Sequence, residues 1–425
     1  MKKIAGFLML APLVGLSQGI HFENESSWQE ILQKAGKEHK YVFVDCYATW
    51  CAPCKQMDQT VYVDDSVAGI VNQNFISVKV QMDSAKNDAQ EVKAWYETAH
   101  ELGNKFQVIG FPTFLFFSPD GQVLHKAIGA RDRAGFLQLA TAAMDSHRQY
   151  FTLLREQKQG RLSFEDMPSL AGCAQEFRDT GLASQLTEHY LRKYLQGLPD
   201  DDLWTKNHIQ FIVHNRKHIH LSDSLFQRFF EDRKRVNEIM ADTGYADEFI
   251  NYKIYNEAVK PLVIVGIGSK REPKWGNIER SIKRQYGPTY VEKNLIDGKV
   301  VYYRFAKQWE LYSKYYVLDL KLADVDHWPS TGIAGIQLNN VAFEVFKHSN
   351  NKTELETALS WVDKVLAGEV RCDPNSLDTK ANILYKLGRK EEAIAFEAQA
   401  AQLSPKDKEI VAAYDKMKNG QPTWE

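Results

Sequence analysis

Residues 42–55 read VFVDCYATWCAPCK and carry the strongest structural signal in the chain. Tyr41 to Tyr47 is a short run of β-branched and aromatic residues, which predicts a buried strand. The cysteine pair follows this strand directly and opens a helix that we expect to run from Cys54 to about Tyr62. Pro53 fits the first turn of such a helix, where its missing N–H costs nothing.

A Cys-x-x-Cys pair serves either metal binding or redox chemistry. A metal-delivery or zinc site would need two further ligands, and none follows Cys51 and Cys54 at a suitable spacing. At a helix N-terminus, Cys51 would face unpaired backbone N–H groups and the positive end of the helix dipole, which stabilise a thiolate. Cys54, one turn further on, is placed to attack a mixed disulfide formed by Cys51. We therefore predict a redox-active dithiol.

Residues 20–148 alternate strand-like and helix-like patterns. Ser27 and Glu30 form a capping box ahead of a helix. Further strands are expected at Phe75–Met82, Thr113–Phe117 and Val123–Ile128, and helices at Ser66–Asn72, Ala85–Leu102 and Asp132–Arg148. The last two strands are joined by the turn sequence Ser-Pro-Asp-Gly. This order predicts an α/β domain with a mixed sheet covered by helices.

This part of the chain resembles the thioredoxin family over about residues 28–145. Residues 42–55 match the strand, active-site turn and helix start of that family, and Lys79, Phe111-Pro112-Thr113 and Gly129-Ala130 match further motifs. Three departures leave the matched groups in place. Ala52-Pro53 replaces the commoner Gly-Pro, Cys46-Tyr47 replaces the usual Phe-Trp, and residues 83–107 exceed the minimal fold.

The resemblance implies a role for each matched residue. Cys51 would be the nucleophile and Cys54 the resolving thiol. Asp45, buried beneath them with a raised pKa, would relay the proton of Cys54, and Lys79 would modulate Asp45. Pro112, as a cis-proline facing the disulfide, would expose backbone for pairing with an extended substrate. The substrate would bind a rim that contains Trp50, Ala52, Pro53, Phe111, Thr113 and Gly129.

The other chemistry-bearing residues give weaker signals. Cys46 alternates with Asp45 along the strand, so we expect it to face the opposite side of the sheet as an inert, packed thiol. Cys173 and Cys372 are expected to be buried singletons, with a bridge between them as the alternative. The set His214, His218 and His220 suggests either part of a metal site or, in our interpretation, a solvated face. Val265 to Lys270 lacks the spacing of a phosphate loop.

The remaining chain is predicted to be helical in two parts. Residues 149–330 carry Leu, Phe and Tyr at helical spacing between Gly, Pro and Asp breaks. Residues 331–420 resemble tetratricopeptide repeats, because small residues and a terminator fall at the expected offsets: Ala358, Gly388, Ala393, Ala400 and Pro405. We expect two repeats and a last helix from about Lys406, with an ordinary helical bundle as the alternative.

Residues 1–19 have the pattern of a signal peptide. Lys2-Lys3 precede the apolar stretch Ile4–Leu16, and Ser17 and Gly19 supply small residues before a cleavage ahead of Ile20. An uncleaved anchor is the alternative, although the stretch is shorter than the roughly 20 residues of a membrane span. Export, with the periplasm as the expected location, would allow disulfides to persist.

Composition narrows the function further. The 425 residues include 53 Lys and Arg against 55 Asp and Glu, a net charge of −2, which argues against a nucleic-acid partner. A mean hydropathy of −0.43 without a long apolar run excludes a polytopic membrane protein. A hydrophobic content of 44% excludes global disorder.

These observations predict an exported thiol–disulfide oxidoreductase of the protein-disulfide reductase type, which contributes to cell redox homeostasis. It would need no cofactor beyond the Cys51–Cys54 disulfide. Its partners would be protein disulfides and an upstream, membrane-bound thiol reductant. The alternative is an interaction adaptor in which the repeats carry the main role and the redox domain is secondary.

Overall fold

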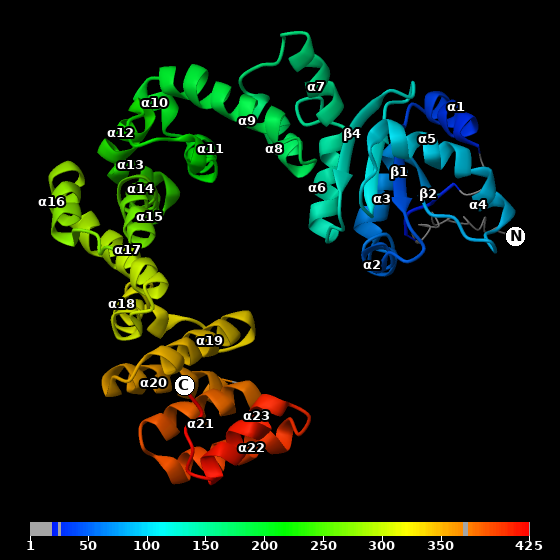
Figure 1. The fold of residues 1–425 in the computed structure, drawn as a ribbon. Helices are drawn as coiled ribbons and strands as arrows, with labels where there is room; N and C mark the ends of the chain where they lie inside the picture. Colours follow the sequence, from blue (N-terminus) through cyan, green and yellow to red (C-terminus); the bar gives the residue numbers. More distant parts are fainter. Residues whose placement is uncertain (1–18, 24–26, 369–372, 425) are drawn as a thin grey trace, which may run out of the picture. The chain divides into compact units, whose positions relative to one another are not determined.

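The computed structural model describes residues 19–23, 27–368 and 373–424. The predicted signal peptide up to residue 18 lies outside these ranges, and so does Cys372, so the Cys173–Cys372 bridge stays a hypothesis. The described chain divides into two compact units, one ending at Leu203 and the other beginning at Trp204. An N-terminal α/β domain followed by a large helical region confirms the predicted fold class (Figure 1).

The first unit contains the whole sheet. Its elements are α1 (Trp28–Glu38), β1 (Tyr41–Tyr47), α2 (Ala52–Thr60), α3 (Asp65–Asn74), β2 (Phe75–Gln81), α4 (Gln90–Ala94), α5 (Tyr96–Phe106), β3 (Thr113–Phe117), β4 (Val123–Ile128), α6 (Arg133–Ala143), α7 (Tyr150–Lys158), α8 (Met167–Glu176), α9 (Thr180–His189) and α10 (Asp200–Leu203). A π-helical turn, Tyr190–Tyr194, follows α9.

The sheet is mixed, as predicted, with the strand order β2-β1-β3-β4. β1 is parallel to β2 and antiparallel to β3, and β3 pairs with β4 in an antiparallel hairpin. In the β1–β2 register Asp45 is the partner of Lys79. The central strand β1 therefore delivers both the buried carboxyl and, at its end, the chain that enters α2.

Alternation along β1 separates two hydrophobic layers. Phe43 packs with residues of α2, α3 and α6 on one face of the sheet. Val42, Val44 and Cys46 pack with residues of α1 and α5 on the other face (Figure 1). Cys46 is fully buried, and burial raises the pKa of its thiol, which agrees with the expected inert cysteine on the face opposite Asp45.

Two predicted helices differ in length from the observed ones. The helix expected from Ala85 starts only at Gln90, because the Asp88 carboxylate accepts the Ala85 N–H at 2.7 Å and holds a turn there. The helix expected to reach Arg148 ends at Ala143. The Gln149 side-chain amide donates to the Ala143 carbonyl at 2.8 Å and so satisfies the helix end.

Helices beyond the sheet pack onto the α/β domain within the first unit. Phe151 of α7 meets Phe106 of α5 with ring centroids 5.8 Å apart. Glu176 of α8 forms an ion pair with Arg131 at 2.9 Å. The predicted domain boundary between residues 148 and 149 stays a prediction. The helices α7 and α8 belong to the same compact unit as the sheet and not to the second unit.

The second unit is helical throughout its described residues. Its helices are α11 (Lys206–His214), α12 (Ser224–Glu231), α13 (Arg233–Met240), α14 (Tyr245–Ile254), α15 (Lys260–Ser269), α16 (Trp275–Tyr286), α17 (Val291–Phe305), α18 (Trp309–Leu322), α19 (Gly332–His348), α20 (Lys352–Gly368), α21 (Pro374–Lys386), α22 (Lys390–Leu403) and α23 (Lys408–Lys418). Val265 to Lys270, which lacks the spacing of a phosphate loop, lies in α15 and its C-cap.

The last five helices cover the predicted repeat region. Ala358, Ala393 and Ala400 are fully buried, as expected for small residues where paired helices pack closely. The helices α19 to α22 are followed by α23, which begins near the predicted start of the last helix. The assignment as tetratricopeptide repeats stays a prediction. In the described ranges, no helix is both long and apolar enough to cross a membrane.

The aromatic packing around Phe43 generates a prediction for stability. Phe43 is fully buried, and its ring lies 5.3 Å from that of Phe116 and 5.5 Å from that of Phe136. We expect Phe43→Ala to cost about 3–5 kcal/mol through lost burial and a cavity. Hydrogen exchange of the β1 and β3 amides measures this loss. Trp50→Ala, at a side chain that is 69% exposed, should change the same exchange by less than about 0.5 kcal/mol, and equal effects would contradict the prediction.

Candidate active site

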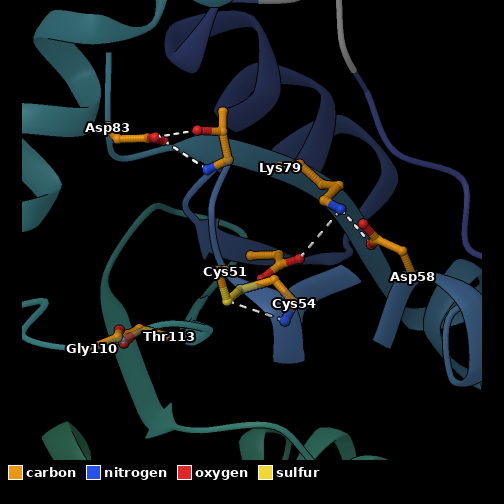
Figure 2. The surroundings of a disulfide bond; sticks show 9 residues. Cys51, Cys54, Asp58, Lys79, Asp83, Gly110 and Thr113 are labelled. Carbon is orange, nitrogen blue, oxygen red and sulfur yellow. Dashed lines mark hydrogen bonds and ion pairs between the residues drawn. A yellow bond between two sulfur atoms is a disulfide. The ribbon is translucent and has the colours of Figure 1, made fainter. Parts of the chain in front are cut away.

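The Cys51–Cys54 disulfide lies at the N-terminus of α2 (Figure 2). Cys51 is the N-cap residue, and its Sγ accepts the backbone N–H of Cys54 at 3.1 Å. Pro53 occupies the first turn, as predicted. The two cysteines are buried in this oxidised state, and Ala48 and Phe111 pack against them. An anionic sulfur at Cys51 would be stabilised by the same N–H and by the helix dipole.

Asp45 is a buried carboxyl on β1, the strand that leads into the segment with this disulfide. Its side chain is 1% exposed, and its Oδ1 makes no hydrogen bond. Burial raises the pKa of Asp45 to about 7, although the Lys79 ammonium, 3.8 Å from Oδ2, opposes the rise. A carboxyl with this pKa exchanges a proton near neutral pH, which is the property required of a proton relay.

Lys79 joins two carboxyl groups rather than one. Besides Asp45 it forms an ion pair and hydrogen bond with Asp58 of α2 (Figure 2). Its ammonium also lies 4.9 Å from the centre of the Tyr47 ring. Sequence reasoning missed Asp58, whose position one helical turn after Cys54 on α2 was the available signal.

The turn that leads into the cysteines is held from the end of β2. Asp83 accepts the backbone N–H of Thr49 at 2.9 Å and also bonds the Thr49 hydroxyl (Figure 2). Thr49 precedes Trp50 and Cys51, so this clamp orients the segment that presents the sulfur. Asp83 was not predicted either, because only the parallel pairing of β1 and β2 brings it beside Thr49.

The predicted substrate rim is assembled in part. The Phe111–Pro112 peptide is cis, and the Phe111 ring packs edge-to-face on Trp50 with centroids 5.7 Å apart. Trp50, Ala52 and Pro53 are exposed. Gly129 donates its N–H to the Pro112 carbonyl at 2.8 Å and adopts φ +88°, a conformation that favours glycine.

Thr113 differs from the other rim residues. Its side chain is fully buried, and its hydroxyl donates to the Gly110 carbonyl at 2.6 Å (Figure 2). The Thr113 side chain therefore supports the loop that carries Pro112 and does not reach the surface.

The set His214, His218 and His220 lies in the second unit, away from the disulfide in sequence. His220 Nδ1 lies 3.5 Å from the Glu257 carboxylate, an acidic partner that the sequence did not reveal. In the parts of the chain that the structure describes, no group of three or more His, Cys, Asp and Glu side chains is arranged to hold a metal ion.

Comparison with known proteins agrees with this geometry. A family model described as a thioredoxin-like domain matches residues 28–143. These residues form a thioredoxin-like domain. The matched region contains the disulfide, Asp45, Lys79 and the cis-proline segment.

The thioredoxin-like domain is similar to part of curated proteins named thiol:disulfide interchange protein DsbD. The protein of Actinobacillus pleuropneumoniae is 32% identical over 110 residues, which cover 26% of this chain and 17% of that protein. The protein of Yersinia pestis is 34% identical over 112 residues, with the same two shares. The aligned part of the chain thus spans 17% of the length of these relatives.

Solved structures also align with the domain. A putative disulphide isomerase from Bacteroides thetaiotaomicron is 33% identical, covering 31% of this chain and 97% of that chain, with a TM-score of 0.26. The DsbD C-terminal domain of Neisseria meningitidis in its reduced form is 22% identical, covering 27% and 90%, with a TM-score of 0.22.

The buried carboxyl generates a prediction for the pH dependence of stability. Burial raises the pKa of Asp45 from 3.8 to about 7. The folded state therefore holds a proton that the unfolded state releases, and stability falls as pH rises from about 4 to about 7. We expect Asp45→Asn to remove this cost and to stabilise the first unit by about 2–4 kcal/mol at pH 8 and far less at pH 4.

Calorimetry of the full chain at both pH values measures the difference. Asp65→Asn, a substitution at an exposed carboxyl of α3, is the matched control and should give no pH-dependent gain. An equal effect of Asp45→Asn at both pH values would show that the carboxyl is not perturbed by burial.

Proposed function

We propose that this chain is an exported thiol–disulfide oxidoreductase that reduces protein disulfides with the Cys51–Cys54 dithiol. The observation that supports this most directly is the pair's position at the start of α2, where Cys51 is the N-cap and its Sγ accepts the Cys54 N–H. The similarity of the domain to DsbD, a protein named for thiol:disulfide interchange, supports the same chemistry.

In the proposed reaction the reduced Cys51 thiolate attacks one sulfur of a substrate disulfide. The substrate's S–S bond breaks, a mixed disulfide forms, and the leaving substrate thiolate takes up a proton from solvent. Asp45 then accepts the proton of Cys54, whose thiolate attacks Cys51 Sγ. The second substrate thiolate leaves, and the protein is left with the Cys51–Cys54 disulfide. The substrate gains two electrons, and an upstream dithiol then supplies two electrons that reduce the Cys51–Cys54 disulfide, becoming a disulfide itself.

Positioning residues support this exchange. Lys79, shared between Asp45 and Asp58, would moderate the proton affinity of Asp45. Trp50 and Phe111 would offer an apolar face to the substrate, and the backbone beside Pro112 would pair with an extended substrate segment. Ala52, Pro53 and Gly129 would complete the contact surface, with Thr113 contributing through its backbone.

The periplasm is the proposed location. The signal-peptide pattern of residues 1–19 supports export. In this proposal a membrane-bound thiol reductant acts upstream of the dithiol. The repeat-based adaptor remains the second candidate, favoured by the closely packed helices around Ala358, Ala393 and Ala400.

Cysteine variants test the reaction. Cys51→Ser should abolish disulfide reduction, measured with insulin and a thiol reductant, because only a thiolate attacks sulfur. Cys54→Ser should retain the first step and accumulate a mixed disulfide on Cys51, whose partner is identified by mass spectrometry. Cys173→Ser is the control, since burial raises the pKa of this thiol to about 12 and keeps it unreactive. Wild-type turnover in Cys51→Ser would eliminate the redox proposal.

The residues between the cysteines predict the direction of the reaction. Ala52 and Pro53 offer no charged group that would stabilise the reduced form as strongly as in the oxidising members of the superfamily. We expect a reduction potential below about −200 mV, nearer to that of thioredoxin than to that of periplasmic oxidants. Equilibration with glutathione buffers measures it, and a value near about −120 mV would assign an oxidising role instead.

A further inference from the structure

A second polar site lies in the second unit, among the last helices. The described residues of α19, α21 and α23, with Val365 of α20, enclose a cavity of about 590 Å³ (Figure 1 shows these helices). The carboxyl groups on its lining belong to Asp373, Asp378, Asp407 and Glu409. None of the described lining residues is Lys, Arg or His. We refer to this cavity as the acidic groove.

Local hydrogen bonds hold these carboxylates without neutralising them. Asp407 is the N-cap of α23 and accepts the N–H groups of Glu409 and Ile410 at 3.0 and 3.3 Å. Asp378 accepts from the Asn382 side chain at 2.9 Å. Among the ion pairs of the described residues, none joins Asp378, Asp407 or Glu409 to a basic side chain. Backbone and amide donors therefore fix the positions of Asp407 and Asp378, and no basic side chain of the described lining neutralises the groove.

The environment of Asn339 on α19 suggests that the groove binds a ligand. It lines the groove, is 8% exposed, and its Oδ1 is buried without a hydrogen-bond donor. A buried carbonyl oxygen without a donor costs about 1–3 kcal/mol, so such groups are rare in folded proteins. A donor that reached this oxygen from the groove would remove this cost. The unpaired oxygen and the carboxylates all accept hydrogen bonds. A complementary ligand would therefore carry N–H donors and positive charge.

Apolar residues determine what kind of cation fits. Ile336, Phe343 and Ile410 line the same groove and suit the methylene stem of a lysine or arginine side chain. Ile333, one helical turn before Ile336 on α19, is 77% exposed and continues the apolar surface outward. A free amine would not use this outer surface, whereas a polypeptide segment would. A bare metal ion fits poorly, because the described carboxylates do not form a metal-binding cluster.

We propose that the acidic groove binds a lysine or arginine side chain on an extended segment of a partner protein. The carboxylates and Asn339 Oδ1 would accept its N–H groups, and the apolar residues would contact its stem and neighbouring residues. This inference goes beyond the proposed redox reaction and stands without it, since the described lining of the groove contains no cysteine.

The test measures peptide binding to the purified full chain by fluorescence anisotropy. The probe is a fluorescein-labelled peptide of alternating alanine and lysine, compared with matched peptides that carry glutamine or glutamate in place of lysine. The lysine peptide should bind at least about tenfold more tightly than the glutamine peptide, and its affinity should fall as salt is added. Equal affinities, or displacement of the lysine peptide by calcium at stoichiometric concentrations, would overturn the proposal.

Two conservative variants test the carboxylates. Asp407→Asn removes charge but keeps an effective N-cap, and Glu409→Gln removes an exposed charge in the first turn of α23. Each should weaken lysine-peptide binding about fivefold or more while the protein stays folded. Glu391→Gln is the matched control, because Glu391 is an exposed carboxyl in the first turn of α22 and does not line the groove. Equal effects of all three variants would reduce the binding to non-specific charge attraction and overturn the proposal.

Asn339→Leu separates ligand binding from structure. Leucine has a similar size and removes the unpaired oxygen, so thermal stability should stay constant or rise. Peptide affinity should nevertheless fall, because the acceptor is lost. A variant that loses stability and keeps its affinity would show that Asn339 serves only the fold. Self-association of the full chain that depends on Asp407 and Glu409 would overturn the proposal by assigning the groove to a second copy.

Discussion

The buried carboxyl of Asp45 is the constraint on which the active site of the first unit depends. A buried carboxylate is costly inside a protein, and Asp45 avoids this cost by holding a proton at pH values where a free aspartate is charged. Parallel pairing of β1 with β2 brings Lys79 to 3.8 Å from it, and the same ammonium also forms an ion pair with Asp58. Burial therefore raises the pKa of Asp45, and the Lys79 ammonium, which also pairs with Asp58, opposes this rise.

The same strand explains why neighbouring residues have opposite properties. Side chains on β1 alternate between two layers, so Cys46 packs among Val42 and Val44 against α1 and α5 while Asp45 lies on the other face of the sheet. A shift of one residue in the register of β1 would bury the carboxyl among aliphatic side chains and turn Cys46 toward the reactive pair. The aromatic layer around Phe43 resists such a shift, and stability and chemistry are coupled through one strand.

Each unit buries a side-chain oxygen that accepts no hydrogen bond, Asp45 Oδ1 in the first and Asn339 Oδ1 in the second. The Asp45 carboxyl can take up a proton, whereas the Asn339 amide cannot be protonated near neutral pH and accepts only from another donor. Glu397 of α22 is fully buried, and burial raises its pKa together with that of Asp378, a residue that lines the acidic groove.

The sequence alone determined the local features of this protein. Residue alternation and turn chemistry placed β1, β3 and β4 at their observed bounds, the capping box placed α1, and the Cys-x-x-Cys pair after a strand indicated the dithiol. Resemblance to a family then pointed to Asp45, Lys79 and the cis-proline segment. Asp58, the Asp83–Thr49 clamp and the acidic groove could not be found in this way, because each joins residues distant in sequence or shared between helices. Tertiary structure decided them, since burial and proximity arise only when separate elements pack, and these two quantities set the pKa of a carboxyl and leave the Asn339 oxygen without a donor.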